Sequence, residues 1–148
     1  MTYRRSLAVL FTLFSLAVIV GCCGLLNPAS RLYGKWNLDV DATINRIAGG
    51  NDIQAGLARA AWGMFGGDVV VEFRSDGTGS FTGKSFAGGE TEEGNWNLKS
   101  ANEDTLVIEF TANSTGQTRE IEILMTDANT FEVSGDDGNA AIFRRVVE

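Results

Sequence analysis

The chain contains no histidine, one proline and two cysteines among its 148 residues. The lack of histidine excludes histidine acid–base catalysis, histidine-based triads and the usual zinc sites. The two cysteines, Cys22 and Cys23, are adjacent and lie near the N-terminus, so everything after residue 30 lacks a disulfide and a cysteine nucleophile. We therefore expect a protein that is not an enzyme, needs no cofactor and holds no metal ion.

Positive charge is also scarce. Twelve lysines and arginines face 19 aspartates and glutamates, which gives a formal net charge of −7 at pH 7. An acidic surface repels phosphate backbones, and no basic stripe is present to displace their counterions. We expect no binding to nucleic acid.

The N-terminus has the pattern of an export signal. Arg4 and Arg5 precede an uncharged apolar run over residues 7–20, which small residues follow. The run ends in Ile-Val-Gly-Cys at residues 19–22, which resembles the lipobox of bacterial lipoproteins. That resemblance implies a signal peptide over residues 1–21 and a lipidation site at Cys22, with a diacylglycerol thioether, further acylation such as palmitate on the amine, and a lipidated tether over residues 22–31.

Two other interpretations of this segment stay open. Residues 7–26 carry no charge and have about the length of a membrane-spanning helix, with Arg4 and Arg5 on the cytoplasmic side. Alternatively, an ordinary signal peptidase cuts nearby and releases the domain. The lipoprotein interpretation predicts a place in the cell envelope, on the periplasmic face of a membrane, with the outer membrane favoured over the inner one. The membrane is then one partner, and the sequence names no protein partner.

Eight segments after residue 30 alternate between apolar and polar side chains. They centre on residues 34–40, 68–75, 78–86, 91–99, 106–110, 121–125, 131–133 and 140–146, with turn residues between them. Such alternation places every second side chain on one apolar face, and short connections make sequence neighbours pair. We predict an all-β fold, an eight-stranded antiparallel up-and-down barrel over residues 32–148, ahead of a two-sheet sandwich.

A helical insert is expected over residues 41–67, between the first two strands. Asp41 is the expected N-cap of a short helix carrying Ile44 and Ile47, and Asp52 that of a second helix. The apolar residues at helical spacing in the second helix are Ile53, Leu57, Ala60 or Ala61, and Met64, and Trp62 and Phe65 widen that face.

Three short motifs in this order resemble those of lipocalins and bacterial lipocalin-like domains. Gly34-Lys35-Trp36 resembles the Gly-x-Trp signature, and Thr126-Asp127 resembles the second lipocalin motif. Arg145, next to Arg144, resembles the arginine that packs over the signature tryptophan. The resemblance implies structural roles for Gly34, Trp36 and Arg145, including a cation–π pair that closes one barrel end. The chain departs from the family in its helical insert, in Ala128 after Thr-Asp, and in lacking a helix after the last strand.

Two functions remain open on this basis. The first is binding of a small apolar or lipid-like ligand, with space near Gly79, Gly83 and Gly94; the residues expected to line the barrel or to form a lid are Trp36, Trp62, Met64, Phe65, Phe73, Phe81, Trp96 and Phe110. The second is a structural or partner-binding envelope protein whose barrel is fully packed. A third use of the insert would place Trp62 and Phe65 against the bilayer. A void of about 300 Å³ or more inside the barrel would favour the ligand binder.

Three glutamates lie close together in the sequence at residues 90–93. Glu90, Glu92 and Glu93 could in principle form a carboxylate pair for acid–base chemistry. Alternation places Glu92 and Glu93 on opposite faces, and we expect a solvated turn there.

Overall fold

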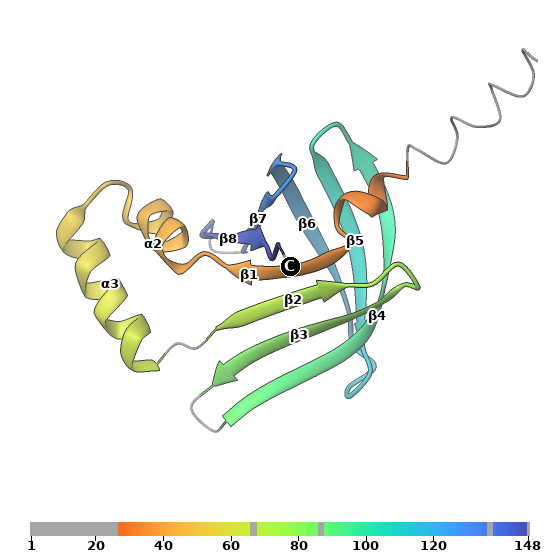
Figure 1. Cartoon of the computed structure of the whole chain (residues 1–148), viewed down its shortest axis with the longest axis horizontal. Helices are drawn as coiled ribbons and strands as arrows, with labels where there is room; N and C mark the ends of the chain where they lie inside the picture. Colours follow the sequence, from red (N-terminus) through yellow and green to blue (C-terminus); the bar gives the residue numbers. More distant parts are fainter. Residues whose placement is uncertain (1–26, 66–67, 86–87, 136–137, 148) are drawn as a thin grey trace, which may run out of the picture.

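The protein folds into a closed β-barrel, seen in a computed structural model (Figure 1). The structure describes residues 27–65, 68–85, 88–135 and 138–147, apart from the side chains at 63–65, 84–85 and 88–90. The export signal, Cys22 and most of the expected tether lie outside this part. The strands are β1 (Gly34–Leu38), β2 (Val69–Phe73), β3 (Thr78–Ser85), β4 (Gly88–Asn102), β5 (Thr105–Ala112), β6 (Thr118–Asp127), β7 (Thr130–Ser134) and β8 (Ala140–Arg145).

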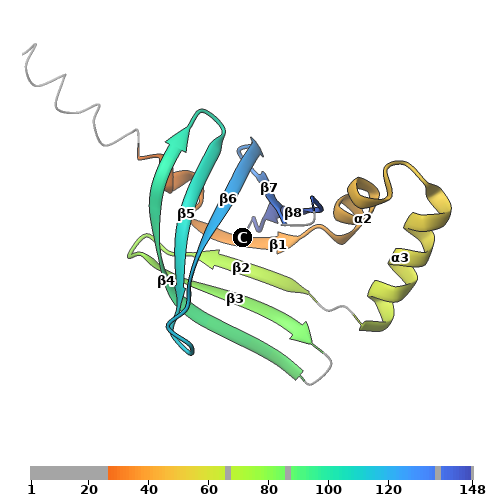
Figure 2. The ribbon, with the colours of Figure 1, turned by 180° about the vertical axis from the view of Figure 1, so that it is seen from behind.

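Each strand pairs antiparallel with its sequence neighbours, and β1 pairs with both β2 and β8 to close the ring. The predicted eight-stranded up-and-down barrel is confirmed, and the sandwich alternative is wrong. In this topology the β1–β2, β3–β4, β5–β6 and β7–β8 connections leave one end of the barrel, and the other three leave the opposite end. The helices therefore branch from the same end as the β5–β6 turn (Figure 2).

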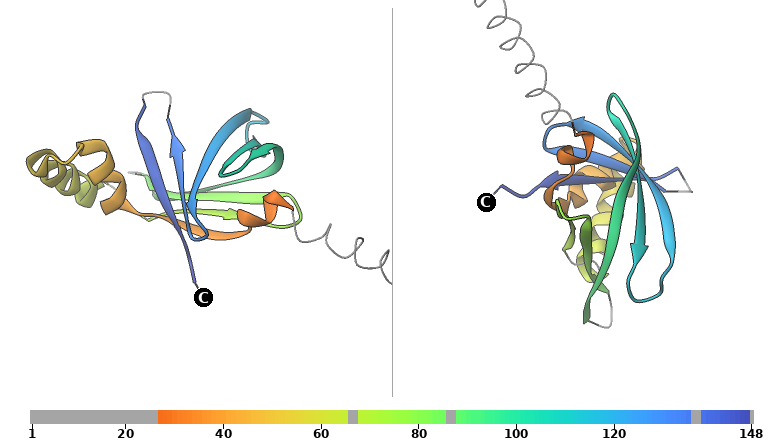
Figure 3. Two further views of the ribbon diagram at one scale, coloured as in Figure 1. Left: turned by 90° about the horizontal axis from the view of Figure 1, so that it is seen from above. Right: turned by 90° about the vertical axis from the view of Figure 1, so that its right-hand side faces the viewer.

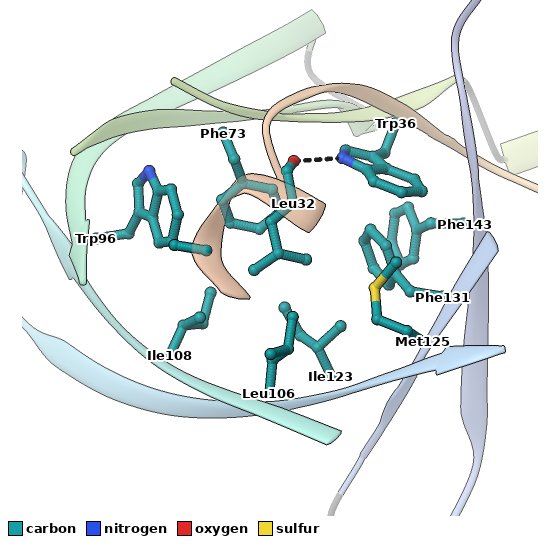
Figure 4. Packing of buried hydrophobic residues seen from close by; sticks show 11 residues of the cluster. Leu32, Trp36, Phe73, Trp96, Leu106, Ile108, Ile123, Met125, Phe131 and Phe143 are labelled. Atoms are coloured by element: carbon teal, nitrogen blue, oxygen red, sulfur yellow. Dashed lines mark hydrogen bonds between the residues drawn. The ribbon is translucent and has the colours of Figure 1, made fainter. Parts of the chain in front are cut away.

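The apolar faces point into the barrel as the alternation predicts. The core cluster includes Trp36 from β1, Phe73 from β2, Trp96 from β4, and further residues from β5 to β8 (Figure 4). These further residues are Leu106, Ile108, Ile123, Met125, Phe131 and Phe143. They pack from the middle of the barrel towards one end, so burial of apolar surface holds that end together.

A short 3₁₀ helix, η1 (Pro28–Arg31), fills this end from the N-terminal side. Ala29 and Leu32 are buried in the core, and the indole Nε1 of Trp36 donates to the carbonyl of Leu32 at 2.8 Å. Residues 28–31, expected to belong to a tether, are thus part of the folded domain.

Arg145 closes the same end over Trp36. Its guanidinium carbon lies 4.2 Å from the centre of the Trp36 ring system, and its Nη atoms donate to the carbonyls of Arg31 and Tyr33. Gly34, with φ at 117°, passes directly beneath, where a Cβ atom would lie 3.2 Å from Nη1 of Arg145. The expected stacking of Trp36 and Arg145 is present, and Gly34 supplies both the backbone conformation and the space for it.

The insert forms two helices, α2 (Val40–Ala48) and α3 (Asp52–Phe65) (Figure 3). The expected N-caps are wrong by one or two residues. The Asp39 carboxylate accepts from the Ala42 amide at 2.9 Å, and the Asn51 side chain accepts from the amides of Ile53 and Gln54. Asp39 takes this role because β1 ends at Leu38, two residues earlier than the alternation predicts.

The predicted apolar face of α3 is also wrong. Ile53 is 79% exposed and Leu57 is 70% exposed, and Ala60 and Ala61 are exposed as well. The contact with α2 is made by Trp62, which was expected on that face and is half-buried, and by Ala55, which was not expected there and is buried. On α2, Ile44 is buried as expected but Ile47 is not. Close packing of two short helices uses the small alanine, so the larger residues face outward.

Candidate ligand cavity in the barrel

The half of the barrel away from η1 and Trp36 is hollow. It contains a cavity of about 510 Å³. The apolar wall consists of Val71, Phe73, Phe81, Ile108, Phe110, Ala112, Ile121, Ile123, Phe131, Val133, Ala141 and Phe143. This volume lies within the range of about 300–1,000 Å³ that is usual for small-molecule sites in proteins.

The cavity opens towards the β5–β6 turn. Thr115, Gln117 and Arg119 line it there, and all three residues are exposed. Phe81 from β3 also lines it and is 46% exposed, so one wall of the mouth is apolar and accessible. The site therefore combines an apolar interior with a polar rim on one side.

Phe110 lies between two glycines on neighbouring strands. A Cβ atom on Gly94 would meet the Phe110 ring at Cζ and, at 2.8 Å, at Cε1, and a Cβ atom on Gly79 would lie 3.7 Å from Cε2 of the same ring. The space expected near these glycines is thus occupied by an aromatic side chain. Gly94 thus gives the Phe110 ring room to approach β4, whereas a Cβ atom on Gly79 would make only an ordinary van der Waals contact with the ring.

Gly83 behaves in a similar way. A Cβ atom there would lie 3.4 Å from the Phe81 ring and 3.9 Å from Val69. The space next to Gly83 is therefore partly taken by its own strand neighbour and not left for a ligand.

Three of the eight predicted lining or lid residues line the cavity: Phe73, Phe81 and Phe110. Trp36 and Trp96 do not, because they pack in the closed end, where the indole of Trp96 donates to the carbonyls of Arg74 and Thr78. Trp62 lies between α2 and α3 and is not part of the cavity wall. The side chains of Met64 and Phe65, like Cys22, fall outside the described part of the chain.

The described side chains of the two helices pack against β8, β7 and each other and lie outside the cavity wall. α2 packs on β8, where Arg144 pairs with Asp39 and Arg46 pairs with Glu132 of β7 at 3.4 Å. α3 is held to α2 by Arg59, which bonds Asp41 at 2.8 Å and also Asn45. No residue of either helix is in the cavity wall among the residues described. Of the expected lid residues, Trp62 is thus away from the cavity, and the lid stays a prediction for Met64 and Phe65, whose side chains lie outside the described part.

Two carboxylates reach the cavity wall, and both have partners on the protein. Glu72 accepts from Arg74 at 2.7 Å, and the pKa of the Arg74 guanidinium is raised by this bond and by a second one to Glu93. Glu92 accepts from the hydroxyl of Ser114 at 2.7 Å and from its amide at 3.2 Å. The expectation of a solvated turn at Glu92 and Glu93 is wrong, because β4 runs through both positions.

Sequence reasoning missed the polar residues at the mouth. Arg119 occupies the inward position opposite Phe110, two residues before Ile121 on the same strand face. The alternation that placed Ile121, Ile123 and Met125 inside also places residues 117 and 119 inside. Glu92 was considered as a carboxylate candidate, and its inward position follows in the same way from its spacing to Gly94 and Trp96.

Comparisons with protein-family models, with curated proteins and with solved structures gave no match to this chain. None of the helices among the described residues combines the length and apolar character needed to cross a bilayer. Across the same residues, no three side chains of the metal-binding types lie together in a way that could hold an ion.

Proposed function

We propose that this protein is a lipocalin-like lipoprotein of the bacterial cell envelope and that its barrel binds a small apolar or lipid-like ligand. The observation that carries the binding function is the cavity of about 510 Å³ with its apolar wall. A fully packed barrel would have favoured a structural or partner-binding protein, and the void exceeds the roughly 300 Å³ that separates the two functions.

The barrel has one packed end and one hollow end, and this arrangement also supports ligand binding. Trp36, Arg145 and η1 make one end rigid, so the opposite end need not be filled for the fold to be stable. A stable scaffold with a preformed apolar cavity binds without a large cost of ordering the site.

Binding is tested by filling the cavity. Ala141, half-buried on β8 opposite Val133, lines the cavity, and a tryptophan at this position would occupy it. The full chain, kept soluble in an amphipathic polymer, is titrated with the neutral apolar fluorophore N-phenyl-1-naphthylamine against a polymer-only blank. We expect saturable binding that Ala141→Trp weakens at least about tenfold, which corresponds to about 1.4 kcal/mol.

The matched control is Ala58→Trp, which adds the same side chain at an exposed position of α3. It should bind the fluorophore as the wild type does. Circular dichroism checks that both variants fold, and Val133→Phe replaces Ala141→Trp if the latter does not. Binding that is absent in the wild type, or unchanged when the cavity is filled, would contradict the proposed function.

The anchor is supported by the sequence around Cys22, and its test is independent of the ligand. Mass spectrometry of the protein extracted from its native membrane should find a mature chain that begins at a lipid-modified Cys22. Cys22→Ser should abolish processing and membrane attachment, whereas Cys23→Ser should leave both unchanged. Unchanged processing and attachment in Cys22→Ser would exclude the lipoprotein assignment.

A further inference from the structure

Among the side chains that the structure describes, one cation, Arg119, lines the mouth of the cavity. Arg119 lies on β6 with Phe110 as its cross-strand partner, and it shares the inward face of the strand with Ile121 and Ile123. Arg119 is exposed, Ile121 is half-buried and Ile123 is buried. The strand thus leads from a charged group at the rim to an apolar wall inside the barrel.

The side chain of Arg119 makes no hydrogen bond or ion pair with any residue that the structure describes, although its backbone belongs to the β5–β6 ladder. The two carboxylates in the same wall are already engaged, Glu72 by Arg74 and Glu92 by Ser114. The other arginines after residue 30 all hold a carboxylate or a carbonyl within the protein; they are Arg31, Arg46, Arg59, Arg74, Arg144 and Arg145. Arg119 is therefore the arginine whose five donors are available to a ligand.

The surroundings of Arg119 suit an anion. A guanidinium binds carboxylate and phosphate groups through two parallel hydrogen bonds. Thr115 and Gln117, which line the mouth beside it, add a hydroxyl and an amide that can donate to the same group. The apolar wall lowers the local dielectric constant, which strengthens an ion pair made at its edge relative to one in open water.

The length of the cavity wall suits a ligand with one acyl chain. Arg119 and Ile123 are four residues apart on one strand, a separation of about 13 Å along the barrel wall. An acyl chain of about ten carbons can run along this wall while its head stays at the rim beside Arg119.

We propose that Arg119 binds the anionic head, a carboxylate or a phosphate, of a single-chain amphiphile whose apolar chain fills the barrel cavity. This inference rests on the proposed function and narrows its ligand class. The chain as a whole carries a net charge of −7, so its overall field repels such an anion. We therefore assign the preference for an anionic head to Arg119, the cation that the described residues place at the mouth.

The test compares three ligands that share one chain: decanoate, decyl phosphate and decan-1-ol. Each is titrated by calorimetry into the full chain in amphipathic polymer, with polymer alone as the blank. We expect both anions to bind about tenfold more tightly than the alcohol, and Arg119→Gln to remove that difference while leaving the affinity for decan-1-ol unchanged. Arg119→Lys, which keeps the charge but loses the fork of donors, should retain part of the preference.

Arg46→Gln is the matched control. Arg46 is an exposed arginine on α2 whose partner is Glu132, and it lies outside the cavity wall. Arg46→Gln should leave the affinities for decanoate, decyl phosphate and decan-1-ol unchanged. Preference for only one of the two anions would identify the head group and support the inference.

Two results would overturn the inference while the proposed function stands: equal affinity of the wild type for the anions and the alcohol, or an anion preference that survives in Arg119→Gln. Absence of binding by all three ligands would overturn both the inference and the proposed function.

Discussion

Replacement of Gly94 by alanine is expected to lower the free energy of unfolding, because the backbone of β4 at this position leaves no room for a Cβ atom. A Cβ atom there would lie 2.5 Å from the carbonyl oxygen of Thr111 and 2.8 Å from Cε1 of Phe110. The ring can rotate, but the Thr111 oxygen is fixed because the backbone around it pairs with β4. Gly94→Ala therefore forces β4 and β5 apart, and overpacking of this kind costs about 1–3 kcal/mol.

The loss is measured by urea unfolding of the full chain, followed through tryptophan fluorescence. In a thermal unfolding experiment, the same destabilisation of about 1–3 kcal/mol would lower the melting temperature by roughly 4–12 °C for a domain of this size. Gly56→Ala is the control, because Gly56 lies inside α3 with no atom within 4 Å of the added Cβ. That substitution should leave stability unchanged or raise it by up to about 1 kcal/mol, since alanine favours helix.

A double-mutant cycle separates the two contacts of the added methyl group. Phe110→Ala removes the ring but not the Thr111 oxygen, so Gly94→Ala should cost less in that background and still cost something. A Gly94→Ala variant within about 0.5 kcal/mol of the wild type, the size of an ordinary surface substitution, would refute the packing argument.

Two further substitutions test other parts of the fold. Arg145→Ala should destabilise by at least about 2 kcal/mol in urea unfolding, because it removes the stacking on Trp36 and leaves carbonyls at the closed end without their donor; stability equal to that of the wild type would contradict this role. The hydrogen bond from the Ala42 amide, and then the interaction with Arg144, lower the pKa of the Asp39 carboxyl in the folded protein. The ionised carboxylate therefore stabilises the folded state at pH values above the unfolded pKa, which is near 3.9. This stabilisation is lost as the pH falls through the lower pKa of the folded state. Asp39→Asn keeps the helix cap but loses the charge, so it should be less stable than the wild type by up to about 1 kcal/mol at neutral pH, with the gap closing in acid; a gap that widens as pH falls would contradict the assignment.

The barrel could be predicted from the sequence because alternation is a local property of a strand. Ile121, Ile123 and Met125 point inward for the same reason that Glu120 and Glu122 do not. Trp36 and Arg145 meet because β1 pairs with β8 at that position, which follows from closing eight consecutive strands.

The cavity could not be predicted, since it depends on how side chains from several strands share the interior. The sequence left a hollow and a fully packed barrel both open; in the structure Trp36 and Trp96 pack at the closed end and Phe110 lies against Gly79 and Gly94. Glycine marks a position where another side chain can approach, but the sequence does not say which one.

Two other differences have simpler causes. Arg119 was overlooked because the inward face was traced through apolar residues alone, although its position in the alternation was visible. On α3 the size of Ile53 and Leu57 predicts a buried position, but both are exposed; the contact with α2 depends on Trp62, as predicted, and on the small Ala55.

The central claim is that the barrel holds an apolar ligand, and a crystal structure of the full chain with 10-bromodecan-1-ol tests it most directly. Anomalous scattering from bromine locates the chain without relying on the shape of the density. We predict a bromine peak inside the barrel, among Ile123, Val133 and Phe143. An interior closed by collapsed side chains, with bromine found only outside the barrel, would contradict the account.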